Sequence, residues 1–198
     1  MRQCGFQLVQ LIVALAVMAG ALVATLPSLL NWSSAHRLRL AAAEFVSAMR
    51  SARLAAVSGG VKVGLKFRSH DEGRVTYTLH RDGDGDGIRS SDIARGVDPQ
   101  IGPRRELRFV GARVRLGFPP GVEPSDPGDP SRRLDRLGDP IRFGRSDIAS
   151  FNALGRSSPG TLYLTDSRLG LVAVRVLAAS GRVRVLVYNA TDDRWRPG

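Results

Sequence analysis

The chain has 198 residues, a mass of 21.3 kDa and a formal net charge of +11. Apolar residues make up 43% and charged residues 24%, which is typical of a globular domain and excludes a disordered chain. The single cysteine, Cys4, excludes an intramolecular disulfide framework and a cysteine-based zinc site. The sequence contains no nucleophile elbow, zinc-protease or phosphate-loop motif, so we expect no enzymatic activity.

The amino-terminal segment contains the one long apolar run of the chain. Residues 6–30 carry no charge, and about 20 apolar residues are enough to cross a bilayer as a helix. We therefore predict a leader at 1–5 and a transmembrane helix over 6–30, which Pro27 would kink. A cleaved secretory signal is the alternative, but its apolar core would be shorter and would end in a small-residue cleavage site.

The next segment, 31–58, has the pattern of an amphipathic helix. Arg37, Glu44 and Arg50 lie off an apolar stripe with helical spacing, and Gly59-Gly60 marks the end. The predicted stripe comprises Leu38, Ala41, Ala42, Phe45, Ala48, Met49, Ala52, Ala55 and Ala56. Residues 6–58 would then form one continuous helix, or else a membrane anchor followed by a separate core helix.

The amino end resembles that of type IV prepilins and type II secretion pseudopilins. A short leader ends in Gly5, Phe6 follows, and the apolar helix begins at once. The stretch FVSAMRSARLAAVSGGVKVGLKF is similar to the GspH/FimT-type minor pseudopilins. The resemblance implies that a prepilin peptidase cleaves between Gly5 and Phe6 and that the new amine of Phe6 is methylated.

Gln10 departs from the family pattern, in which a glutamate usually stands at this position. The resemblance implies that the glutamate would pair with the amino end of a neighbouring subunit inside the fibre. An unpaired buried charge is costly, so such a pair helps to set the register of the subunits. Gln10 can form hydrogen bonds but cannot neutralise a charge, which is compatible with a rare subunit.

The residues after Gly60 follow a period of two, which predicts strands. We expect strands over 61–67, 75–80, 106–110, 112–116, 141–143, 161–165, 171–177 and 182–188. The short link 178–181 predicts a hairpin between the last two. Six prolines predict a long exposed loop over 118–140, which is either a contact surface or a tolerated insertion. The predicted fold is α+β and pilin-like, with one long amino-terminal helix packed on antiparallel sheets formed by 61–198.

An acidic loop over 82–92 is the first candidate site. Asp82, Asp84 and Asp86 alternate with glycines, as in calcium loops of the EF-hand type. The carbonyl of Ile88 and the carboxylate of Asp92 would complete the set of ligands, although Asp92 lies one residue before the usual closing position. A metal-free turn between two strands is the alternative.

Three arginines are the second candidate site. Alternation places Arg182 and Arg184 on one face of their strand, and Arg175 can join them across the hairpin. Such a face attracts phosphate groups, and Gly181-Arg182-Val183-Arg184 resembles a DNA-binding pattern of FimT-like minor pilins. A solvated sheet face is the alternative.

These features predict a minor pseudopilin that assembles into a type II secretion pseudopilus and acts in protein secretion. The resemblance implies a single-pass protein of the bacterial inner membrane, with a cytoplasmic amino end before cleavage and a periplasmic globular domain. Its implied partners are other pseudopilins, the prepilin peptidase and the inner-membrane assembly platform. The alternative function is that of a FimT-like minor pilin of a type IV pilus, which binds DNA during DNA uptake.

Overall fold

The computed structural model describes residues 4–70, 73–109, 114–144 and 146–198; within the first helix, side chains are described at 9–20 and from 34 onward. The chain falls into two compact units, Met1–His36 and Arg37–Gly198. One helix, α1 (Cys4–Gly59), contributes residues to both units. Each unit is described by itself below.

The first unit consists of the amino-terminal part of α1. From Val9 to Met18 its large apolar side chains are exposed, with exposed fractions between 56% and 68%, and Gln10 is exposed among them. Across the residues that the structure describes, no helical stretch combines the length and the apolarity needed for a bilayer span. The side chains at Phe6 and Pro27 lie outside the described residues, so cleavage at Gly5, methylation of Phe6 and the kink stay predictions.

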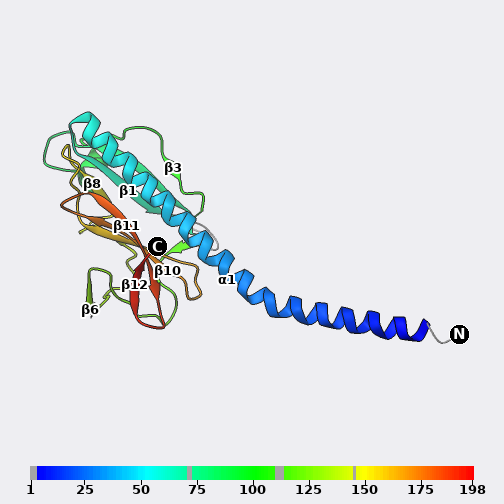
Figure 1. Ribbon diagram of the computed structural model, residues 1–198. Helices are drawn as coiled ribbons and strands as arrows, with labels where there is room; N and C mark the ends of the chain where they lie inside the picture. The colour runs from blue at the N-terminus through cyan, green and yellow to red at the C-terminus, as the bar shows by residue number, and fades with distance from the viewer. Residues whose placement is uncertain (1–3, 71–72, 110–113, 145) are drawn as a thin grey trace. The chain divides into compact units, whose positions relative to one another are not determined.

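In the second unit, the carboxyl half of α1 buries its apolar stripe against both sheets. The predicted stripe is confirmed, because Leu38, Phe45 and Met49 are buried and only Ala55 is partly exposed. Several positions of the stripe are alanines, and small side chains let the helix approach the strands closely. Glu44, on the flank, accepts hydrogen bonds from the backbone N–H groups of Arg108 and Phe109, at 3.0 and 2.9 Å. Figure 1 shows this half of α1 lying along the strands.

Two main antiparallel sheets form the rest of the second unit. The first has the order β3-β2-β1-β8, with β1 (Val63–Ser69), β2 (Val75–Arg81), β3 (Arg105–Glu106) and β8 (Ile148–Phe151). The second has the order β12-β11-β10-β9-β4, and β7 also pairs with β9. Its strands are β4 (Arg115–Leu116), β7 (Ile141–Arg142), β9 (Gly160–Thr165), β10 (Leu171–Leu177), β11 (Arg182–Asn189) and β12 (Arg194–Pro197). The expected combination of one helix with antiparallel sheets is therefore confirmed.

The hairpin between β10 and β11 is also confirmed, with Val172 opposite Val187 and Leu177 opposite Arg182. Gly181 closes its turn at a φ of 60°. A β-carbon at this position would lie 2.1 Å from the carbonyl oxygen of Gly155, so both the backbone angle and the lack of space require glycine. The glycine of the Gly-Arg-x-Arg pattern thus has a structural role in this chain.

The segment 118–140 differs from the continuous exposed loop that its prolines predict. It contains a small hairpin of β5 (Ser125–Asp126) and β6 (Asp129–Arg133), and Pro130 lies within β6. Proline is tolerated there because a two-stranded ribbon leaves one edge of each strand unpaired. The side chains of Phe118, Ser125 and Leu134 are buried. The segment covers the second sheet on the face opposite α1.

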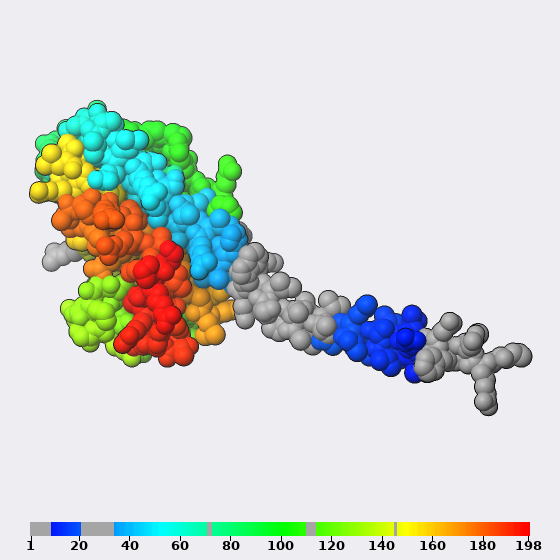
Figure 2. Space-filling view, in the orientation of Figure 1, coloured from blue at the N-terminus to red at the C-terminus, as the bar shows by residue number. Residues whose placement is uncertain are grey.

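A second hydrophobic cluster lies under this segment. Phe118 and Leu134 pack with Tyr163, Leu171, Ala173 and Tyr188 of the sheet. Trp195 of β12 donates a hydrogen bond from Nε1 to the carbonyl of Ser125 at 2.8 Å, and the hydroxyl of Tyr188 donates to Asp193 at 2.7 Å. Aromatic side chains at the carboxyl end of the chain therefore hold the segment in place. Figure 2 shows this end, in red, beside the light-green β5–β6 region.

Candidate functional sites

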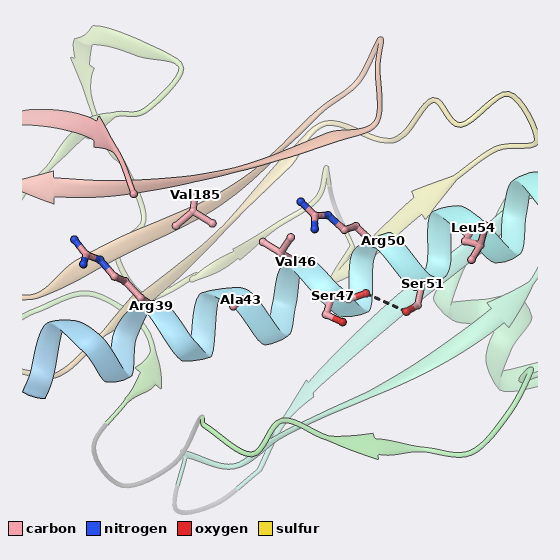
Figure 3. Close-up of a pocket in the computed structure, with 9 residues that line it drawn as sticks. Arg39, Ala43, Val46, Ser47, Arg50, Ser51, Leu54 and Val185 are labelled. Carbon is pink, nitrogen blue, oxygen red and sulfur yellow. Dashed lines mark hydrogen bonds between the residues drawn. The ribbon is translucent and has the colours of Figure 1, made fainter.

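A groove of about 530 Å³ runs beside α1 within the second unit. Its helical wall carries Arg39, Ala43, Val46, Ser47, Arg50, Ser51 and Leu54, and Val185 of β11 and Gly198 form the other wall. Figure 3 shows Arg39 and Arg50 on the side of the helix that faces Val185. The groove lies between the flank of α1, next to the stripe that packs on the sheets, and the residues Val185 and Gly198.

The groove combines an apolar floor with two arginines, Arg39 at one end and Arg50 farther along the helical wall. No carboxylate side chain is among its lining residues, and neither Arg39 nor Arg50 forms an ion pair with a residue that the structure describes. Leu54 has an exposed fraction of 69%, which is high for a large apolar side chain. An apolar surface with unpaired arginines is typical of a protein–protein contact surface.

The acidic turn brings together three of the five predicted calcium ligands. One carboxylate oxygen from each of Asp82, Asp84 and Asp86 lies within 4.8 Å of the others. Asp82 accepts the backbone N–H groups of Gly85 and Gly87, at 2.7 and 3.0 Å. Burial alone would raise the pKa of Asp82, but these two hydrogen bonds and nearby Lys62 lower it below its usual value. The three residues fit a cation through their oxygen atoms, and calcium binding stays a prediction.

Asp92 lies outside the group that Asp82 forms with Asp84 and Asp86, and the carbonyl of Ile88 stays a predicted ligand. The sequence did not predict the short helix α2 (Ser90–Arg95), in which Asp92 is 1% exposed and forms an ion pair with Arg95. The second carboxylate oxygen of Asp92 has no hydrogen-bond partner among the described residues. The structure therefore gives Asp92 the role of holding α2 and does not place it as a closing ligand.

Asp98 organises the turn, although sequence reasoning missed it. Its side chain is buried, and its two oxygens accept the backbone N–H groups of Gly83 at 3.2 Å and Arg89 at 3.0 Å. It lies 15 residues from Gly83, so no local spacing signals the contact. The glycine is required there too, because a β-carbon on Gly83 would lie 1.9 Å from the carbonyl oxygen of Val97.

The three arginines of the second candidate site share one face, as the alternation predicts. Arg175 lies directly opposite Arg184 in the β10–β11 register, and Arg182 lies two residues before Arg184. Arg182 and Arg184 are exposed, but Arg175 is half-buried and has Asp126 at 3.9 Å. The hairpin of 118–140 therefore reaches the edge of this face, and DNA binding stays a prediction centred on Arg182 and Arg184.

The chain is similar to two solved structures of the minor pseudopilin EpsH from the type II secretion system of Vibrio cholerae. One is 11% identical, with a TM-score of 0.37, and the match covers 83% of this chain and 96% of that one. The other is 15% identical, with a TM-score of 0.38 and coverage of 75% and 94%. No protein-family model and no curated protein sequence matches the chain.

Proposed function

We propose that this protein is a minor pseudopilin, a subunit of a type II secretion pseudopilus that acts in protein secretion. The proposal rests on the different exposure of apolar side chains in the two parts of α1. Its apolar side chains from Val9 to Met18 are exposed, whereas the stripe from Leu38 to Ala56 is buried against two sheets. A helix with a run of uncovered apolar side chains needs another apolar environment for them, either lipid or neighbouring helices.

The amino-terminal residues support the same function. The junction of Gly5 and Phe6, placed directly before an uncharged run, resembles a prepilin cleavage site. In this proposal the apolar half of α1 anchors the chain in the inner membrane and later packs among sister helices. The globular unit faces the periplasm, and a prepilin peptidase and an assembly platform act on the amino end.

The groove beside α1 is the contact surface that we assign to a sister subunit. Leu54 is its most exposed large apolar side chain, and full burial of such a side chain contributes about 1.5–3 kcal/mol of transfer free energy. Arg39 and Arg50 favour a partner surface with carboxylates, since no side-chain carboxylate of this chain lines the groove. The proposal includes no catalytic role, and His80 is occupied by hydrogen bonds to Thr78 and to the carbonyl of Asp98.

Processing provides the first test. We expect mass spectrometry of the protein from cells with a prepilin peptidase to show a chain that begins at Phe6 with a methylated amine. Cells without the peptidase should retain Met1, and Gly5→Val should do so even when the peptidase is present. A natural chain that keeps Met1, or one that begins after Leu30, would contradict the proposal.

Cysteine cross-linking provides the second test, and the single native cysteine causes no background in the processed chain. Cys4 lies in the leader, so the processed chain would contain no thiol. A Ser47→Cys variant should therefore form a cross-link through the groove to a co-expressed pseudopilin in assembling cells. The matched control is Arg168→Cys, at an exposed position away from the groove. Equal cross-linking from the two positions would show that the groove is not the contact surface.

A further inference from the structure

The face of the first sheet that points away from α1 carries an unusual row of residues. Because side chains alternate along a strand, Val63, Leu65 and Phe67 of β1 point into the core, and Lys66 and Arg68 point outward. In the β1–β2 register, Arg68 lies opposite Thr76, Lys66 opposite Thr78 and Gly64 opposite His80. Cations therefore stand beside hydroxyl groups in consecutive pairs.

This face is hollowed into a cleft of about 140 Å³. Ile93 of α2 and the segment 96–104, which leads to β3, form its walls. This segment contributes Gln100 and a third cation, Arg104. No carboxylate is among the lining residues. Arg68 and Arg104 are exposed and form no ion pair or hydrogen bond with the residues that the structure describes, whereas Lys66 contacts the hydroxyl of Ser90 at 3.4 Å.

The wall of the cleft beside His80 is held by fixed hydrogen bonds. The Nδ1–H group of His80 donates to the carbonyl of Asp98 at 3.1 Å, because a carbonyl can only accept. Nε2 must then accept from the hydroxyl of Thr78, at 2.9 Å. Burial lowers the pKa of His80, so the ring stays neutral at pH 7. The positive charge of the cleft thus comes from Lys66 and the two arginines alone.

Carboxylates lie at the rim and limit the size of a ligand. Glu106 of β3 is opposite Thr76 in the register, and Asp147 is close enough to Lys66 for the lysine to counteract the rise in pKa that burial causes at that carboxyl. An extended polyanion that runs along the sheet would meet these like charges. A compact anion between Arg68 and Arg104 would meet only Glu106, across Thr76 from Arg68.

We propose that this cleft binds a small tetrahedral oxyanion, either free phosphate or the phosphate monoester of a small molecule. The guanidinium groups of Arg68 and Arg104 offer forked donors that match phosphate oxygens. Lys66 and the second amide hydrogen of Gln100, whose first donates to the carbonyl of Gly102, offer further donors. This site is separate from the groove beside α1 and does not depend on the proposed role in secretion.

Calorimetric titration of the full-length chain tests the proposal. Inorganic phosphate and glycerol phosphate are titrated separately at pH 7.5 and constant ionic strength, with chloride as the replaced ion. We expect saturable binding of one anion per chain. The double variant Arg68→Gln/Arg104→Gln should weaken it at least tenfold, and Arg68→Lys/Arg104→Lys should lie in between, because the charge remains but the fork is lost. Glu106→Gln should strengthen binding by removing a like charge from the rim.

The matched control is Arg168→Gln/Arg194→Gln, which removes the same charge from exposed positions that do not line the cleft. It should change the affinity less than twofold. Phosphate and its ester share the tetrahedral oxyanion and differ in the one oxygen that carries the glycerol group, so tighter binding of one assigns the natural source to that form, and either result supports the site. Heat that does not saturate, or an equal loss of affinity in Arg68→Gln/Arg104→Gln and in Arg168→Gln/Arg194→Gln, would show general attraction to a basic protein and overturn the proposal.

Discussion

Replacing Phe45 with alanine is expected to lower the free energy of unfolding by about 3–5 kcal/mol. Phe45 is fully buried on the stripe of α1, and its ring lies 5.3 Å from that of Phe67, on β1. The same cluster includes strands of both sheets, so the cavity would open where helix and sheets meet. The flanking alanines cannot fill it, because they have no side-chain atoms beyond the β-carbon. Urea denaturation followed by tryptophan fluorescence and circular dichroism measures the effect.

Leu54→Ala is the matched control for this prediction. Leu54 is on the same helix, but its exposed fraction is 69%, so its loss should change stability by less than about 0.5 kcal/mol. The helical propensities of leucine and alanine are close, which keeps the backbone contribution small. Similar effects of the two substitutions would mean that α1 does not pack on the sheets through this stripe.

Asp98→Ala should have the second largest effect. The substitution removes the acceptors of the backbone N–H groups of Gly83 and Arg89, and each donor left unsatisfied costs roughly 1–3 kcal/mol. The acidic turn and α2 would lose their common attachment. We expect thermal unfolding at a lower temperature and faster amide hydrogen exchange over 82–95, measured with a chelator present so that no metal contributes.

Asp84→Ala separates this structural role from calcium binding. Asp84 is exposed and accepts only the N–H group of Asp86 from the described residues, at 3.3 Å, so its loss should cost little in chelator. Added calcium should stabilise the native chain but not the Asp84→Ala variant if the three carboxylates hold a cation. An Asp98→Ala variant as stable as Asp84→Ala in chelator would contradict the role assigned to Asp98.

The sequence predicted those parts of the fold that depend on local periodicity. The stripe from Leu38 to Ala56 and strands β1, β2, β10 and β11 follow the spacing of apolar residues closely, because each element has one face on the same core. Of the strand predicted over 106–110, only Glu106 lies in a strand, at the end of β3, and part of the remainder lies outside the described residues.

Contacts between distant parts of the chain were not predictable in this way. The prolines of 118–140 indicate an irregular segment, but they do not reveal that Trp195, 70 residues from Ser125, covers it. Strands β8 and β12 are four residues each, too short for a reliable alternation. The cleft between Arg68 and Arg104 combines residues of β1, β2, α2 and the segment before β3, which are distant in sequence. Asp98 accepts hydrogen bonds from backbone N–H groups, which every residue type except proline has, so no sequence motif marks their partner.

The contacts of Trp195 and Tyr188 with the segment 118–140 have a consequence for the order of folding. During synthesis, α1 and strands β1 and β2 leave the ribosome early, and β1 pairs with β2 over a short stretch of chain. The layer formed by 118–140 gains its cover only when the residues up to Trp195 have emerged, 70 residues after Ser125. Until then Phe118 and Leu134 lack their partner Tyr188, so a ribosome stalled before β12 should hold a nascent chain whose 118–140 segment is open to proteases.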